Sequence, residues 1–168
     1  FIQRRLRPGL AGLFRTARDR GRTTSLDTGW DPDQLWLSDD LRAVFAHTDI
    51  FLPNETEFAH ITGGADIEAG MAVLHTMGVG EVVLKRGARG SVYSGPGGWV
   101  EHPGFLVEPR ATTGAGDACN AGYIAGRLIG LDIAGRLALA NACGALTVAA
   151  LGGTGGLTSL EQAQALIE

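Results

Sequence analysis

Apolar and polar residues in the first half of the chain follow two periods, one typical of amphipathic helices and one typical of buried strands. Residues 9–20 place apolar side chains every three or four positions, which predicts a helix that Gly21 ends. In residues 81–84 the apolar side chains run together, which predicts a strand buried on both faces. The same reasoning predicts strands at 23–27 and 49–52 and helices at 39–47, 55–61 and 66–77. The side chains expected to face the core are Leu10, Leu13, Phe14 and Ala17 in the first helix, Leu41, Val44 and Phe45 in the second, and Ile67, Met71 and Leu74 in the fourth.

The second half of the chain begins with a different pattern. Residues 91–94 and 99–101, joined by a four-residue Gly-Pro-Gly-Gly turn, read as a β-hairpin, and residues 106–108 read as one more strand. Helices are then expected at 116–128, 133–151 and 159–167, the last capped by Thr158 with Glu161. Alternating strands and helices predict a three-layer α/β/α sandwich with a mostly parallel central sheet. Ligands of such sheets bind beyond the carboxyl ends of the strands.

Composition supports one globular unit. The chain has 168 residues, 45% of them apolar, and a formal net charge of −4, which excludes a disordered tail. Its 26 glycines are about twice the usual share and indicate several backbone positions with special conformation or close approach. Residues 1–22 carry seven arginines and one aspartate, but the acidic total argues against nucleic-acid binding, so these arginines are expected to form a solvated face.

Cysteine usage and the longest apolar run bear on the cellular setting. Cys119 and Cys143 lie among small apolar residues, which is typical of two reduced, buried thiols in a cytoplasmic protein. The apolar run 137–151 contains Asn141 and is too short for a membrane span. We therefore expect no membrane partner.

Glycine-rich loops offer one candidate for an anion site. A P-loop needs Gly-Lys-Ser/Thr, and the only lysine, Lys85, precedes Arg86. A dinucleotide fingerprint is approached only at 114–119, where Cys119 stands in place of the third glycine. What remains is the small-residue stretch 111–122 at the start of a predicted helix, whose amides of residues 114–117 would be open to an anion.

Asp117 in this stretch has two interpretations. A carboxylate beside a phosphate site is explained if it acts as a general base toward a substrate hydroxyl while the amides stabilise the transferred phosphoryl group. Alternatively, Asp117 only caps the helix.

The wider pattern resembles the ribokinase-like (pfkB-type) carbohydrate kinase family. Residues 112–117 match its D-T-x-G-A-G-D signature from the threonine onward, residues 54–57 its N-x-x-E motif, and residues 85–90 its x-x-G-x-x-G turn, in the same order and spacing. Residues 140–142 and 152–154 stand where that family closes around adenine. The resemblance covers nearly the whole chain.

This resemblance implies roles for individual residues. Asp117 would be the general base, with Gly114, Ala115 and Gly116 as the anion hole over the γ-phosphate of ATP. Glu57 and Asn54 would organise Mg2+, partly through water, and Asn54 would also organise phosphate oxygens. The other nucleotide contacts would be Lys85, Arg86, Gly87, Ala88, Arg89, Gly90, Thr112 and Asn141.

Taken without the resemblance, several of these residues have simpler explanations. Asn54 and Glu57 form a helix capping box by sequence, and Lys85 could be a solvated cation at a strand end. Asn141 could be a core amide with satisfied hydrogen bonds. The four histidines show no ligand spacing, and none is assigned to a metal.

The sequence also departs from the family. Ala111 replaces an aspartate that helps to hold a monovalent cation, which argues against K+ activation through this position. Backbone carbonyls of Thr113, Ala150 and Gly152 remain candidates for such a cation. In residues 27–31 the arginine of the D-x-N-x-R stretch is absent, which makes a substrate with an added acidic group less expected.

Length is the largest departure. Residues 1–168 correspond to about the C-terminal half of a family member, a single partial domain without the N-terminal lid region that supplies most sugar contacts. The resemblance implies an ATP-dependent carbohydrate kinase that phosphorylates a hydroxyl of a small sugar, with a homodimer of the full-length protein left open. The alternatives are a nucleoside or other small-alcohol kinase and a nucleotide-binding fragment without activity of its own.

Overall fold

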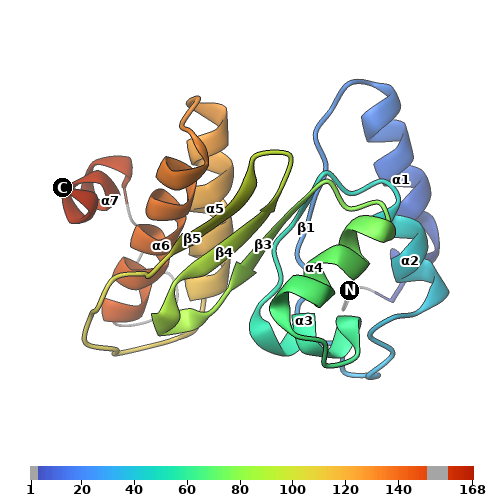
Figure 1. The fold of residues 1–168 in the computed structure, drawn as a ribbon, viewed down its shortest axis with the longest axis horizontal. Coiled ribbons are helices and arrows are strands. Elements are labelled where there is room, and N and C mark those ends of the chain that lie inside the picture. The colour runs from blue at the N-terminus through green and yellow to red at the C-terminus, as the bar shows by residue number, and fades with distance from the viewer. Residues whose placement is uncertain (1–3, 151–158) are drawn as a thin grey trace. The chain divides into compact units, whose positions relative to one another are not determined.

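The computed structural model describes residues 4–150 and 159–168, in which strands and helices alternate (Figure 1). The strand order in the sheet is β1-β2-β3-β4-β5. β1 pairs with β2 and β2 with β3 in parallel, with Leu26 opposite Phe51 and Phe51 opposite Val82. The strands are β1 (Ser25–Leu26), β2 (Ile50–Phe51), β3 (Glu81–Lys85), β4 (Ser91–Gly95) and β5 (Gly98–His102). An open mixed sheet with intervening helices confirms the predicted three-layer α/β/α class.

Most predicted helices are present within one or two residues of their expected limits. The predicted inward faces of the second and fourth helices are largely confirmed, since Leu41, Val44, Phe45, Met71 and Leu74 are all buried, whereas no residue of the first predicted helix is buried. The helices are α1 (Arg7–Asp19), α2 (Asp39–Phe45), α3 (Glu55–Thr62), α4 (Ile67–Thr76), α5 (Ala115–Leu128), α6 (Ile133–Ala149) and α7 (Leu160–Ile167), with a short 3-10 turn at Gly87–Arg89.

Four local predictions are wrong. Residues 106–108 form no strand, and Leu106 is 95% exposed, because no partner strand covers it. The hairpin turn has two residues rather than four, since β4 and β5 each extend by one glycine. Leu13 of α1 is exposed. The capping box of α7 is made by Ser159 and Gln162, whereas Thr158 lies outside the described residues.

The chain divides into two compact units, and each has its own core. One unit comprises Phe1–Leu84 with Ser94–Gly98, and the other comprises Lys85–Tyr93 with Trp99–Glu168. In the first unit Phe45 and Phe51 pack edge to face with ring centres 4.9 Å apart. In the second, Tyr93, Tyr123 and Leu137 are fully buried.

Within the second unit, α5 and α6 pack along each other over most of their length (Figure 1). Gly122 permits this approach, because a Cβ there would lie 2.8 Å from both the Cα of Ala140 and the carbonyl oxygen of Leu139. Gly144 of α6 faces α5 less tightly, since a Cβ there would stand 3.5 Å from the carbonyl oxygen of Ala115. Gly122 is therefore the tightest point of this helix pair, and Gly126 of α5 is the next, since a Cβ there would lie 3.2 Å from the Cα of Arg136.

Gly122→Ala should lower the free energy of unfolding by about 2 kcal/mol, because backbone atoms of α6 must move to admit the methyl group. Gly144→Ala, in the same interface at ordinary contact distance, should keep it unchanged or raise it by up to about 1 kcal/mol, because alanine favours the helix interior. Chemical denaturation of both variants measures the difference. Equal stability of the two would contradict the close approach.

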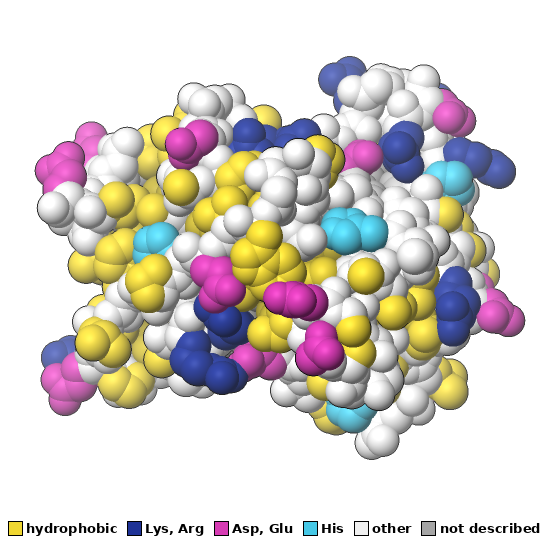
Figure 2. Space-filling model, viewed as in Figure 1, with side chains coloured by type: hydrophobic (Ala, Val, Ile, Leu, Met, Phe, Trp, Pro, Cys, Tyr) yellow, Lys and Arg dark blue, Asp and Glu magenta, His cyan; other side chains and the backbone are white. Residues whose placement is uncertain are grey.

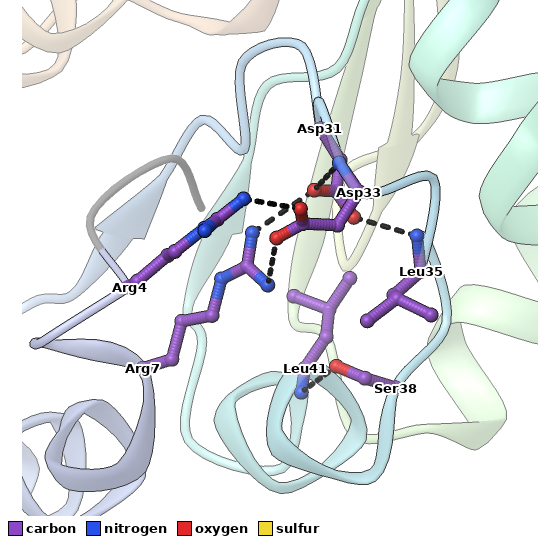
Figure 3. Close-up of polar contacts among 7 residues, drawn as sticks. All are labelled: Arg4, Arg7, Asp31, Asp33, Leu35, Ser38 and Leu41. Atoms are coloured by element: carbon purple, nitrogen blue, oxygen red, sulfur yellow. Dashed lines mark hydrogen bonds and ion pairs between the residues drawn. The ribbon is translucent and has the colours of Figure 1, made fainter.

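In the first unit, an ion-pair cluster fixes the loop between β1 and α2 (Figure 3). Arg7 at the start of α1 donates to Asp31 at 2.9 Å; the Asp31 side chain is buried, and that of Arg7 is 11% exposed. Arg4 and Arg7 also pair with Asp33. Arg7 is therefore an exception to the solvated arginine face predicted for residues 4–22.

Asp31 is held ionised inside this loop. Burial raises the pKa of its carboxyl, but the backbone amides of Asp33 and Leu35, together with Arg7, outweigh that effect and lower the pKa below its ordinary value. The carboxylate therefore stabilises the fold most where it is ionised.

Asp31→Ala should lower the free energy of unfolding at pH 7 by about 3 kcal/mol, because it leaves the mostly buried Arg7 without its closest carboxylate. The pKa of Asp31 is lower in the folded state, so its contribution is present above about pH 4 and is lost as pH falls through the folded pKa. Urea unfolding of wild type and variant from pH 7 down to pH 3 should show the gap narrowing. A gap that is constant with pH would contradict this assignment.

Candidate active site

The N-terminus of α5 has the geometry of an anion site. Gly114 precedes the helix with φ 85° and ψ −7°, a left-handed conformation that favours glycine. Only two amides of this turn find backbone acceptors in the described part of the chain: that of Ala115 donates to Thr112 O and that of Ala118 to Gly114 O. The amides of Gly116 and Asp117 lie between them at the positive end of the helix dipole.

Asp117 lies in the first turn of α5 and is exposed. The N-cap residue is Gly114, and no side chain caps this helix. The capping interpretation of Asp117 is therefore wrong. The carboxylate lies in the first turn of α5 and faces solvent.

Gly116 has no steric reason to be glycine within the described residues. It is exposed, its φ lies outside the left-handed region, and the nearest atom to a Cβ there would be Nζ of Lys85, at an ordinary 3.7 Å. An alanine would fit and would favour the helix. The missing side chain therefore points to a requirement for open backbone at this turn.

Lys85 is not the solvated cation that the strand end suggested. It is only 9% exposed, and its Nζ donates to Asn120 Oδ1 at 3.0 Å. Sequence reasoning missed Asn120, although its place three residues after Asp117 puts it on an adjoining part of the same helix surface.

The turn after β3 is closed by its own backbone. The amide of Arg86 donates to Gly90 O at 2.8 Å, and that of Gly90 to Gly87 O at 3.0 Å. Gly90 (φ 78°) must be glycine, because a Cβ would overlap the backbone of His102 and Gly104. Gly87 also has a positive φ of 57° and opens the turn. Ala88 and Arg89 complete this short 3-10 turn.

Two side chains of β5 border this turn. Glu101 accepts from the Trp99 indole and from Arg86, each at 3.0 Å, and these bonds lower the pKa of Glu101. Burial lowers the pKa of His102, whose Nδ1 accepts from the amide of Gly104.

On the face viewed in Figure 2, basic and acidic side chains are interspersed rather than gathered by sign.

Asn141 has its hydrogen bonds satisfied inside the second unit. It is 9% exposed and donates from Nδ2 to Ser91 Oγ and to Leu137 O, both at 2.7 Å. This geometry fits the core interpretation of the residue. Its contact with adenine stays a prediction.

In the first unit, Asn54 and Glu57 form a reciprocal capping box at the start of α3. Asn54 Oδ1 accepts from the amide of Glu57, and Glu57 Oε2 accepts from the amide of Asn54, both at 2.9 Å. Glu57 is buried and Asn54 is exposed. The cap fixes the direction of both side chains, and their role toward Mg2+ stays a prediction.

The segment that leads to α5 is anchored on the end of α6. The amides of Arg110 and Ala111 both donate to Val148 O, at 2.9 and 3.1 Å. Of the residues predicted to hold a monovalent cation, Thr113 is exposed and Ala150 ends α6, whereas Gly152 lies outside the described residues. Across residues 4–150 and 159–168, His, Cys, Asp and Glu side chains form no group of three or more that could hold a metal.

Comparison with known proteins identifies the family. The profile of the pfkB family carbohydrate kinases matches residues 9–160. The chain belongs to this pfkB family. An ATP-dependent ribose-1-phosphate kinase of Halopiger xanaduensis is 34% identical over 143 residues, which are 82% of this chain and 44% of the relative. A ribokinase of Bacillus subtilis is 31% identical over 72% of this chain and 40% of its own length. The chain thus spans less than half the length of these pfkB relatives.

Solved pfkB structures share the fold. An E. coli protein assigned as ribokinase II, crystallised with ATP and Mg2+, superposes with a TM-score of 0.84 at 31% identity, covering 92% of this chain and 51% of its own. A Vibrio cholerae fructokinase with fructose, ADP and calcium bound gives 0.83 at 25% identity, covering 94% and 54%. The ribokinase-like fold predicted from the motifs is confirmed.

No helix in the described ranges has the length and apolar character needed to cross a bilayer.

Gly116→Ala should keep or raise the free energy of unfolding, by up to about 1 kcal/mol, because alanine favours the helix. It should weaken ATP binding about tenfold or more, because the methyl group covers the amides that a phosphate would reach. Gly114→Ala is the matched variant and should lose about 1–2 kcal/mol of stability through its left-handed backbone. Titration calorimetry with ATP measures the binding affinity, and denaturant unfolding measures the stability of both variants. Undiminished ATP binding by Gly116→Ala would contradict the anion site.

Proposed function

We propose that this chain carries the nucleotide-binding and catalytic part of an ATP-dependent phosphotransferase that phosphorylates a hydroxyl group of a sugar. The observation that supports the proposal most is the N-terminus of α5, where the exposed Asp117 carboxylate lies in the same turn as the open backbone of Gly116 and two amides that find no backbone acceptor in residues 4–150 and 159–168. Family membership and the names of the relatives point to the same reaction.

In the proposed reaction, Asp117 accepts the proton of the sugar hydroxyl as the hydroxyl oxygen bonds to the γ-phosphorus of ATP. The bond from that phosphorus to the bridging oxygen breaks, and ADP leaves with the electron pair. The amides of Gly114, Gly116 and Asp117 stabilise negative charge on the oxygens of the transferred group. Positioning and charge stabilisation are the main demands of this transfer.

The residues proposed to organise Mg2+ offer suitable ligand types. Glu57 and Asn54 carry carboxylate and amide oxygens, which Mg2+ prefers, and the capping box holds both in fixed orientation. Mg2+ at this position would neutralise charge on phosphate oxygens. The turn at residues 85–90 is proposed to run along the nucleotide, and Thr112 and Asn141 to lie beside it.

The sugar contacts are proposed to come largely from sequence outside the stretch shared with the relatives, which is 44% of the ribose-1-phosphate kinase and 40% of the ribokinase. Residues 1–168 alone would then transfer phosphate poorly, because the lid that excludes water is not among them. A cytoplasmic setting is also proposed, on the placement of Cys119 and Cys143 among small apolar residues of the sequence.

A nucleoside kinase is the second candidate, because a cytidine kinase of Thermococcus kodakarensis is 36% identical over 108 residues. A panel of sugars and nucleosides offered to the full-length protein distinguishes the two. Turnover of nucleosides but not of free sugars would favour this candidate.

Asp117→Asn should lower turnover by about a thousandfold, because the amide cannot accept the proton, while ATP affinity stays within a few-fold of wild type. Asp132→Asn is a matched control, since Asp132 is an N-cap of α6 that accepts from Gly135, and asparagine caps equally well. Steady-state kinetics and ATP binding on both variants provide the test. Wild-type turnover of Asp117→Asn would rule out the general base.

A further inference from the structure

Lys85 is the only lysine in the chain, and its side chain is buried, a position that is unfavourable for a charged group. Its side chain ends β3, is 9% exposed and reaches Asn120 in the second turn of α5. Burying an ammonium group costs free energy unless its surroundings repay that cost. The position of this charge therefore needs an explanation.

The ammonium group lies beside the first turn of α5. Its Nζ is 3.0 Å from Asn120 Oδ1 and 3.7 Å from the point where a Cβ on Gly116 would stand. Gly116 is exposed and Lys85 is buried, so the ammonium group lies on the interior side of this turn. The opposite side of the turn faces solvent.

A cation at this end of a helix opposes the helix dipole, which favours negative charge at the N-terminus. The unfavourable interaction becomes favourable when an anion occupies the adjoining amides, because the lysine and the dipole then act on it together. A buried charge acts through a low dielectric, so its effect on that anion is stronger than in water.

We propose that Lys85 is a positioning residue for phosphoryl transfer, oriented by Asn120 to supply a fixed positive charge behind the Gly114–Gly116 anion hole. This inference rests on the proposed function. Asn120 directs the ammonium toward the turn before substrate binds, so that no reorganisation is needed as charge develops.

The test uses the full-length protein with Lys85→Met, Lys85→Arg and Asn120→Ala. Lys85→Met should lower kcat about tenfold to a hundredfold while KM for ATP changes only a few-fold, because the charge acts mainly on the transition state. Its Tm should stay close to that of wild type, since methionine keeps the packing of the apolar lysine stem. Lys85→Arg should recover part of the lost kcat, and Asn120→Ala should lower kcat about tenfold with the charge retained.

Three outcomes would overturn the proposal. One is a Lys85→Met kcat within twofold of wild type. Another is a fall in Tm in which Lys85→Arg restores stability and kcat together, the signature of a purely structural role. The third, used if Lys85→Met does not fold, is an Asn120→Ala enzyme with unchanged kcat. Asp117→Asn, measured in parallel, distinguishes a failure of this inference from a failure of the proposed function. If Asp117→Asn keeps wild-type turnover, both the proposed function and this inference fail. If Asp117→Asn is inactive and Lys85→Met keeps wild-type kcat, only the role of Lys85 is contradicted.

Discussion

The close approach of α5 to α6 at Gly122 is the constraint on which the candidate site depends. With a Cβ position 2.8 Å from the α6 backbone, any larger residue would force the two helices apart. The same pair carries both ends of the signature loop. The amides of Arg110 and Ala111 are bonded to Val148 at the end of α6, and residues 115–117 are the first turn of α5. The loop that contains Gly114 is therefore anchored at both ends by two packed helices. These anchors hold Gly114 in its left-handed backbone conformation.

This arrangement concentrates positive potential on a small area of backbone. The dipole of a 14-residue helix, two amides that have no backbone acceptor among the described residues and the buried ammonium group of Lys85 all converge on the first turn of α5. Asp117 is the one acidic residue in that turn, and it is exposed. Such a combination suits chemistry in which a proton leaves on one side while negative charge develops on the other. In the first unit, by contrast, Asn54 and Glu57 are bonded to the backbone of their own helix, which sets their direction.

The sequence could predict the helices, the positions of most strands along the chain and the loop at 112–117. These follow from local periodicity, glycine placement and a motif of fixed spacing. It could not predict the lack of pairing at Leu106 or the exposure of Leu13, because both depend on whether another element covers an apolar residue. Lys85 and Asn120 are 35 residues apart, and only the folding of the second unit brings their side chains together. The Arg7–Asp31 pair was missed for the same reason, since seven arginines near the N-terminus look alike in sequence.

The central claim is that the first turn of α5 binds the terminal phosphate of a nucleoside triphosphate. A crystal structure of the full-length protein with a non-hydrolysable ATP analogue tests this most directly. We expect γ-phosphate oxygens within hydrogen-bonding distance of the amides of Gly116 and Asp117. A triphosphate bound elsewhere, with these two amides still facing solvent, would contradict the account.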